Sequence, residues 1–187
     1  MKLWDCYLRW RHSRGFGVHS PYAYRFITNV LRPGPYIYYS YHEVDRWLQG
    51  PEKCNHKFER FVLFTIRLAI FLKSKRILVL NSKSRLSEVT AAALKLPCVV
   101  IRSRNKVNFK EGDLLIIDKS DCNNSLLDRA IKEYVAVFAI SPGPETREFL
   151  ETPVPKGLLL NGKDRMILIP RQEMEYVSYN LNLGGGI

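Results

Sequence analysis

Short apolar runs alternate with polar or helical stretches in the second half of the chain. The runs are Arg76 to Leu80, Cys98 to Arg102, Leu114 to Asp118 and Tyr134 to Ile140. Uninterrupted apolar runs of this length are typical of parallel strands buried on both faces of a sheet. Helical spacing between them predicts crossover helices at 84–94 and 123–132. The second crossover has only about ten polar residues, close to the minimum for parallel strands, so we expect it to lack a helix.

The C-terminal segment predicts strands joined by much shorter links. Strand-like segments at 157–160, 165–169 and 176–183 are separated by links of a few residues at 161–164 and 170–173. Links this short permit only antiparallel pairing. The pattern therefore predicts a mostly parallel sheet that ends in an antiparallel hairpin, followed by a flexible tail at 184–187.

The N-terminal part predicts helices rather than strands. Large apolar side chains have helical spacing at 2–12 and 21–31, and Ser20 before Pro21 is typical of a capped helix start. We also expect a short helix at 40–49 and a longer one at 56–73. The predicted fold is α/β and Rossmann-like, with an N-terminal helical segment, 1–55, packed on a core domain, 56–183.

Composition supports one domain with an anionic partner. The chain has 187 residues, 46% of them hydrophobic, and a formal charge of +11, most of it in residues 1–75. Such a surplus favours nucleic acid, nucleotides or acidic membrane surfaces as partners. Arginines and aromatic residues are interspersed in the N-terminal part, at Arg9, Arg11, Arg14, Arg25, Arg32 and at Trp4, Tyr7, Trp10, Phe16, Tyr22, Tyr24. They either bind phosphates and stack on bases, or form a solvated helical face with its rings in the core.

Cysteine spacing and hydropathy exclude several other classes. The four cysteines are widely scattered, and Cys54 with His56 has no second pair at zinc-ligand spacing, so we expect free thiols and no metal site. The first residues lack the apolar run of a secretory signal. The most apolar stretch, 61–72, is too short to span a bilayer and contains Arg67. We therefore expect a cytoplasmic protein without a transmembrane segment.

The layout of residues 56–183 resembles the class I S-adenosylmethionine-dependent methyltransferase superfamily. In that family a parallel sheet binds the cofactor at its carboxyl edge and closes with an antiparallel hairpin. The segment from Gly15 to Ile27, GFGVHSPYAYRFI, is similar to an N-terminal signature of small methyltransferase-like proteins of Bacteroidetes-type bacteria. The resemblance implies S-adenosylmethionine as the cofactor. It assigns cofactor contacts to Leu80, Asn81, Ser82, Lys83, Ser84, Arg85, Arg102 and Asp118.

The chain departs from the family at the positions that bind the cofactor. Val79 stands in place of an acidic residue, and Asn81, Lys83 and Arg85 stand in place of three glycines. Asn81 can still adopt the positive-φ turn that this loop requires. Lys83 and Arg85 would repel the methylsulfonium. Arg102 replaces the acidic residue that would accept hydrogen bonds from the ribose, which indicates either no ligand or a phosphorylated one.

Three functions remain open from the sequence. An active methyltransferase would use Asp118 and His19 near the transfer site, although Asp118 is equally well explained as a capping carboxylate together with Asp121. A non-catalytic scaffold would bind a nucleotide, RNA or another anion through the cations at the carboxyl edge, Lys83, Arg85, Arg102, Arg104 and Lys106. A partner-binding domain would form a homodimer through its aromatic N-terminal helices.

Overall fold

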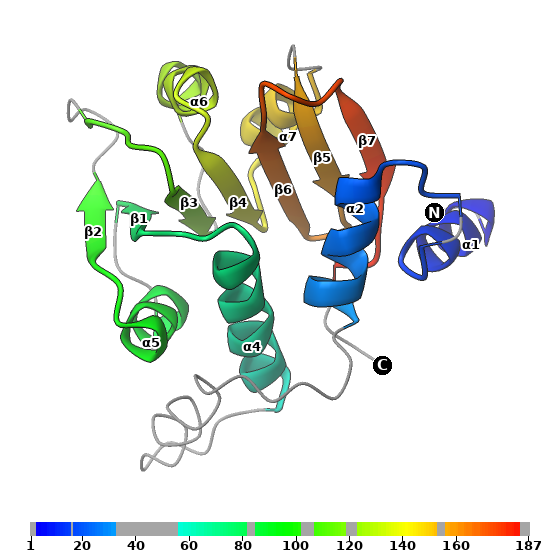
Figure 1. Cartoon of the computed structure of the whole chain (residues 1–187), viewed down its shortest axis with the longest axis horizontal. Helices are drawn as coiled ribbons and strands as arrows, with labels where there is room; N and C mark the ends of the chain where they lie inside the picture. The colour runs from blue at the N-terminus through cyan, green and yellow to red at the C-terminus, as the bar shows by residue number, and fades with distance from the viewer. Residues whose placement is uncertain are drawn as a thin grey trace.

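The computed structural model describes residues 3–15, 17–32, 56–81, 85–101, 107–118, 123–152 and 156–183, which form one seven-stranded sheet with helices on both faces (Figure 1). The strands are β1 (Arg76–Leu80), β2 (Cys98–Ile101), β3 (Asp113–Asp118), β4 (Ala136–Ile140), β5 (Gly157–Asn161), β6 (Arg165–Pro170) and β7 (Val177–Asn180). The helices are α1 (Leu3–His12), α2 (Pro21–Phe26), the π-helical turn η1 (Ile27–Leu31), α4 (His56–Phe71), α5 (Arg85–Leu94), α6 (Asn124–Lys132) and α7 (Pro144–Glu151).

The strand order is β2-β1-β3-β4-β6-β5-β7. Strands β1 to β4 are parallel, and β6 returns antiparallel between β4 and β5. The predicted fold class, a mostly parallel α/β sheet with an antiparallel hairpin and an N-terminal helical segment, is confirmed. The hairpin of β5 and β6 follows from the short 162–164 link, which cannot hold a crossover.

The last strand corrects one prediction from the sequence. We expected β7 to pair antiparallel with β6 because the link between them is short. Instead β7 pairs in parallel with β5, with Leu158 opposite Val177 and Asn161 opposite Asn180. The reason is that β6 lies between β4 and β5, so both of its hydrogen-bonding edges are already occupied. The chain therefore passes β5 and continues the sheet on its outer edge.

Each face of the sheet packs into its own apolar core. One core joins α4, α5, α2 and η1 to side chains that alternate along the strands. It includes Phe26 of α2, Phe64 of α4 and Phe138 of β4, all of which are fully buried. The other core joins α6 and α7 to the intervening strand side chains, such as Leu115 and Ile117. Buried strands with apolar residues on both faces are what the sequence pattern predicted. None of the helices in the described ranges is long and apolar enough to cross a bilayer.

The predicted helix at 21–31 forms with its predicted cap. Ser20 accepts a hydrogen bond from the Ala23 N–H at 3.3 Å, and Pro21 occupies the first turn. The helix ends in the π-helical turn η1, where the Nε of Arg67 in α4 donates to the carbonyl of Val30 at 2.9 Å. This contact ties the N-terminal helices to the helix that leads into β1.

Helix α7 was not predicted from the sequence. It begins at Pro144, where the missing N–H costs nothing in a first turn, and buries Thr146 and Leu150, which are four residues apart. Only these two of its eight side chains are fully buried, so the apolar period is too short to stand out from a loop. Pro144 after Gly143 was the available signal for a helix start.

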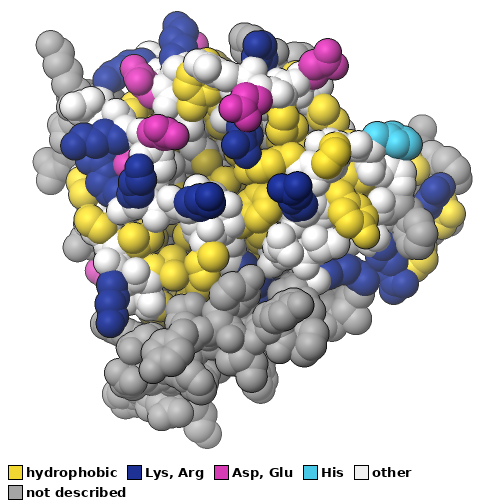
Figure 2. Space-filling model, viewed as in Figure 1, with side chains coloured by type: hydrophobic (Ala, Val, Ile, Leu, Met, Phe, Trp, Pro, Cys, Tyr) yellow, Lys and Arg dark blue, Asp and Glu magenta, His cyan; other side chains and the backbone are white. Residues whose placement is uncertain are grey.

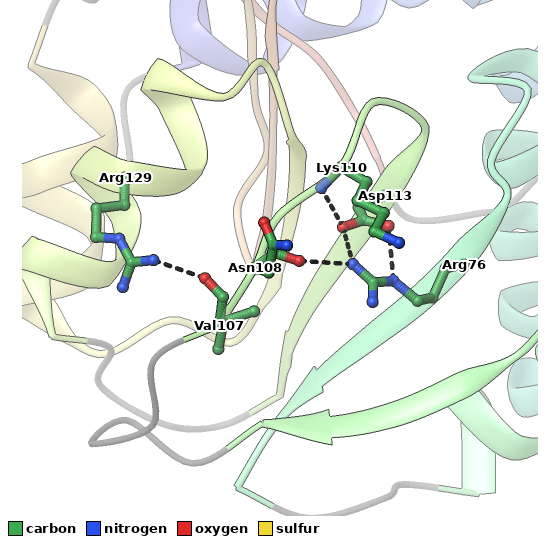
Figure 3. Close-up of polar contacts among 6 residues, drawn as sticks. All are labelled: Arg76, Val107, Asn108, Lys110, Asp113 and Arg129. Carbon is green, nitrogen blue, oxygen red and sulfur yellow. Dashed lines mark hydrogen bonds and ion pairs between the residues drawn. The ribbon is translucent and has the colours of Figure 1, made fainter.

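The connection into β3 is held by polar contacts at the amino ends of β1 and β3 (Figure 3). Arg76 forms a bidentate ion pair with Asp113, and its Nη2 also donates to the carbonyl of Asn108 at 3.0 Å. The Lys110 N–H donates to the Asp113 carboxylate at 2.8 Å. Residues 107–112, the described part of this crossover, contain no helix.

Helix α6 holds the same connection from the other side. The Nη2 of Arg129 donates to the carbonyl of Val107 at 2.6 Å, as Figure 3 shows, and its guanidinium lies 5.9 Å from the ring of Phe109. Val107 and Phe109 are both buried in the core under α6. Two arginines therefore anchor this extended segment, which packs where a crossover helix would otherwise lie.

Candidate functional site

The carboxyl ends of β1 and β3 form the topological switch point of the sheet. The chain leaves β1 for β2 on one side and then returns to β3 on the other side of β1. In open α/β sheets, ligands bind in the crevice at such a point because the following loops diverge there. This edge is therefore the candidate site.

Asn81 makes the turn out of β1. Its φ is 65°, a left-handed conformation that Asn tolerates better than most residues. Its N–H donates to the carbonyl of Ile101 at 2.7 Å, which joins the ends of β1 and β2. The prediction that Asn81 takes a positive-φ turn is confirmed.

Asp118 ends β3 at the same level. Val79 pairs with Ile116, so the register continued by two residues brings Asn81 level with Asp118. Alternation along β3 directs Asp118 toward the same face as Ile116, which is the face covered by α4 and α5. Its side chain is partly exposed, and it makes no hydrogen bond or ion pair with another described residue. Asp118 thus places a partly exposed carboxylate, a hydrogen-bond acceptor, at the switch point.

Two arginines border the site beside the first turns of α4. The guanidinium of Arg85, the first residue of α5, lies 5.5 Å from the Phe58 ring, and that of Arg165 lies 4.0 Å from the Phe61 ring. Cation–π contact at these distances is favourable and holds both guanidinium groups against α4. The carboxyl edge therefore carries one carboxylate, Asp118, and two cations, Arg85 and Arg165.

Arg165 is the more buried of the two. Its side chain is 11% exposed, its Nη1 donates to the Leu183 carbonyl at 2.8 Å, and its buried Nε has no hydrogen-bond partner in the described part of the chain. Burial lowers the pKa of Arg165, and the nearby Asp164 carboxylate opposes that shift. Arg165 pairs with Ile140, which in turn pairs with Asp118, so the two charged residues are two strands apart, about 10 Å.

The other predicted site residues are placed as follows. Leu80 ends β1 with its side chain in the core under α6 and α7. His19 is exposed and lies at the far edge of the sheet, where the N–H of neighbouring Ser20 donates to the Tyr179 hydroxyl of β7 at 3.3 Å. Four strand spacings, about 19 Å, separate β7 from β3. The structure therefore brings Asn81, Arg85 and Asp118 to one edge and leaves His19 elsewhere.

Several predictions fall on residues outside the described ranges, so they stay predictions. They are the helix at 40–49, the tail at 184–187, Phe16, Cys54, Ser82, Lys83, Ser84, Arg102, Arg104, Lys106 and Asp121, together with the side chains of Trp4 and His56.

Arg165 and Ser141 were missed by the sequence analysis. Ser141 follows β4 with a φ of 45°, and its N–H donates to the Asp164 carbonyl at 2.7 Å. The short link after Asn161 was the signal, because a hairpin that returns beside β4 must begin its second strand at the edge where β4 ends. The link alone does not place Arg165, because the sequence does not show that the second strand of the hairpin returns beside β4.

The described residues suit the adenosine part of S-adenosylmethionine better than its methionine part. Asn81 supplies the tight turn, and Asp118 can accept hydrogen bonds from a nucleoside. Val79, which stands where the resemblance implies an acidic residue, is fully buried, so β1 offers no carboxylate to the cationic methionine end. The described residues at this edge therefore offer a hydrogen-bond acceptor on Asp118 but no acidic side chain on β1.

No protein-family model matches this chain, and no curated protein is significantly similar to it.

The face drawn in Figure 2 carries Lys and Arg side chains spread over it, with hydrophobic side chains visible between them and Asp and Glu mainly near the upper edge. The basic balance of the whole sequence is thus visible on this surface.

Proposed function

We propose that this chain is a divergent methyltransferase-like protein that binds a nucleoside-containing ligand at the carboxyl ends of β1 and β3. S-adenosylmethionine is the ligand that the family resemblance suggests. The observation that carries the proposal is the positive-φ turn of Asn81 at the level of Asp118, on either side of the switch point. Tight turns there allow a ligand to approach the backbone closely.

Each residue of the site has a role in this proposal. Asn81 shapes the loop, and the Asp118 carboxylate accepts hydrogen bonds from the ribose hydroxyls or a base amine. Arg85 faces the anionic part of the ligand. A bound S-adenosylmethionine would supply an electrophilic methyl group. We assign no proton transfer to His19, because its neighbour Ser20 contacts β7, which is four strand spacings, about 19 Å, from β3.

A nucleotide or another anionic ligand at the same edge is the second candidate. Arg85 and Arg165 favour it, since both are cations on the face that Asp118 shares. A phosphorylated ligand would pair with the guanidinium groups, whereas a sulfonium, itself a cation, would be repelled by them. Affinity for such a ligand would fall as salt is added.

Thermal unfolding with candidate ligands tests the proposal. The protein is heated with S-adenosylmethionine, S-adenosylhomocysteine, ATP or NADP. A ligand at 100 times its dissociation constant stabilises the fold by roughly 2.7 kcal/mol, a shift of roughly 5 to 11 °C for a domain of this size. A shift with the two adenosyl ligands supports the methyltransferase-like site, and one with the phosphates alone supports the second candidate. No shift with any of the four contradicts both.

A pair of matched variants locates the binding. Asp118→Ala removes the acceptor at the switch point, and a tenfold loss of affinity would roughly halve the shift at the same ligand concentration. Asp128→Ala removes an exposed carboxylate of α6 whose partner is Lys132, four residues away, and should leave the shift unchanged. Equal effects of the two substitutions would place the ligand elsewhere.

A further inference from the structure

Helix α1 lies against the edge strand β7, at the opposite edge of the sheet from β2 (Figure 1). One of its faces is tied to the sheet edge. Arg9 donates to the Asn161 carbonyl at 3.0 Å, His12 Nδ1 lies 3.3 Å from the Asn180 carbonyl, and Ser13 accepts from the Asn182 N–H at 2.7 Å. These contacts fix which face of the helix points away from the protein.

The outward face carries two aromatic rings and two guanidinium groups. Tyr7, Trp10, Arg11 and Arg14 are three or four residues apart, so they share one side of the helix and the turn that follows it. Tyr7 is 45% exposed and Trp10 is 47% exposed. Large aromatic side chains are expensive to leave in water, so two adjacent exposed rings mark an interaction surface.

Rings and cations on this face are stacked together. The Tyr7 and Trp10 rings are 6.2 Å apart at an interplanar angle of 23°. The guanidinium of Arg14 lies 4.4 Å from the Trp10 ring and that of Arg11 lies 5.7 Å from the Tyr7 ring. A guanidinium stacked by its face keeps its N–H donors at its rim, where they can pair with an anion.

The sequence around this face contains only one acidic residue, Asp5, near the start of α1. No Asp or Glu occurs from Cys6 to His42, and the cations of that segment are all arginines, Arg9, Arg11, Arg14, Arg25 and Arg32. Arginine recognises phosphate through a planar fork of donors and stacks on aromatic rings, which lysine does not do. Both the charge and the choice of cation therefore favour a phosphate-bearing partner with flat groups.

We propose that the outward face of α1 binds single-stranded nucleic acid. Bases stack on the rings of Tyr7 and Trp10, and Arg11 and Arg14 pair with the flanking phosphates. Exposed bases of a single strand can reach the rings, whereas those of a duplex are stacked on one another. This site is independent of the one at the switch point, because α1 lies beside β7, four strands from β3.

An anionic membrane fits this face less well. A helix that lies in a membrane surface separates an apolar face from a charged one. Here the guanidinium groups lie over the rings themselves, so insertion of the rings among acyl chains would carry the charges of Arg11 and Arg14 with them.

Fluorescence anisotropy with the full chain tests the proposal. The probes are labelled oligouridine and oligothymidine of about 12 nucleotides. In Trp10→Ala/Arg14→Ala the dissociation constant should rise at least about tenfold, since stacking and one phosphate contact are both lost. Trp10→Phe keeps a ring and should retain most of the affinity. The tighter of the two probes identifies RNA or DNA as the strand.

Tyr134→Ala/Lys132→Ala is the matched control, since it also removes one exposed ring and one cation, far along the chain in and after α6. It should change the dissociation constant by less than about twofold. Arg11→Ala/Arg14→Ala should reduce the slope of log affinity against log salt by about 1.4. Equal losses in the test and control variants would overturn the proposal.

Two further results separate this site from its alternatives. Asp118→Ala should leave oligonucleotide binding unchanged. A failure of the α1 proposal can therefore be told apart from a failure of the switch-point proposal. Vesicles of phosphatidylcholine and phosphatidylserine are tested by co-sedimentation with the same variants. Vesicle binding that depends on Trp10 and Arg14, without oligonucleotide binding, would make the partner a membrane and overturn the proposal.

Discussion

Arg76 and Asp113 form a bidentate ion pair across the amino ends of two neighbouring strands. They are register partners on β1 and β3, with Nε donating to Oδ1 at 2.8 Å and Nη2 to Oδ2. The Asp113 side chain is 2% exposed, and the Arg76 side chain is 24% exposed. The hydrogen bonds to Asp113 raise the pKa of Arg76, and partial burial opposes this shift. The pair also holds the segment that leads into β3.

Removing one partner of this pair should cost far more than removing both. Arg76→Ala leaves a buried carboxylate without its counter-charge, and we expect a loss of about 3 kcal/mol in the free energy of unfolding. Arg76→Met/Asp113→Leu removes both charges and should lose clearly less. Urea denaturation measures each, with Lys132→Ala in the exposed pair with Asp128 as the control, where at most about 0.5 kcal/mol is expected. Equal losses for Arg76→Ala and the control would contradict this account.

Ser13 should control how firmly α1 is held. Its buried hydroxyl donates to the Arg9 carbonyl at 2.6 Å and accepts from the Asn182 N–H at 2.7 Å. Ser13→Ala loses both hydrogen bonds, so we expect the free energy of local opening of α1 to fall by about 1 kcal/mol. Amide hydrogen exchange in α1 should then quicken about fivefold while β3 is unchanged. Ser125→Ala, at an exposed position of α6, should leave the rate of amide exchange in α1 unchanged.

Gly157 should tolerate no side chain. Its φ is 139°, and a Cβ there would lie 2.6 Å from the Ile169 carbonyl oxygen and 2.9 Å from the Pro170 Cα. Both are backbone atoms of the paired strand, so Gly157→Ala should lower the free energy of unfolding by more than about 2 kcal/mol. Gly17→Ala also has a positive φ, 75°, but its Cβ would meet only the His12 ring at 3.8 Å. Its loss should be about 1 kcal/mol. Thermal unfolding that ranks the two in the reverse order would refute the clash.

Tyr22 should make the fold less stable at alkaline pH. Burial raises the pKa of Tyr22 above its ordinary 10.0, although Arg171, which lies over the ring at 4.5 Å, opposes the shift. Above about pH 10 the unfolded phenol loses its proton while the folded one keeps it, so the free energy of unfolding falls as pH rises toward the folded pKa. Burial also raises the pKa of Tyr176.

Urea denaturation between about pH 8 and about pH 11 measures this decline in the free energy of unfolding. The range spans the ordinary pKa of tyrosine, about 10. Tyr22→Phe should lose less stability across the range than the unaltered chain, and Tyr22→Phe/Tyr176→Phe should lose still less. An identical decline in all three proteins would show that neither phenol is its source.

The cap, the turn and the strands could be predicted because each depends on neighbouring residues. Ser20 before Pro21 caps its helix, as expected from the two residues themselves. Asn81 takes the positive φ that its side chain tolerates. The apolar runs became strands because a run with no polar side must be covered on both faces, and helices on both faces cover it.

The composition of the candidate site depended on strand order, which no local pattern contains. Asp118 was correctly predicted to end a strand, but its relation to Arg165 arises because β6 enters between β4 and β5. His19 is separated from Asp118 because α1 and the turn after it lie beside β7.

The sequence by itself determined the type and approximate position of most elements, because hydrophobic period, caps and turn residues act over a few residues. The tertiary structure alone decided that β7 joins β5, that Arg165 stands at the carboxyl edge, and that Trp10 faces solvent while Arg9 faces the sheet. Those outcomes depend on which hydrogen-bonding edges remain open once the other strands have paired, and that is a property of the assembled sheet.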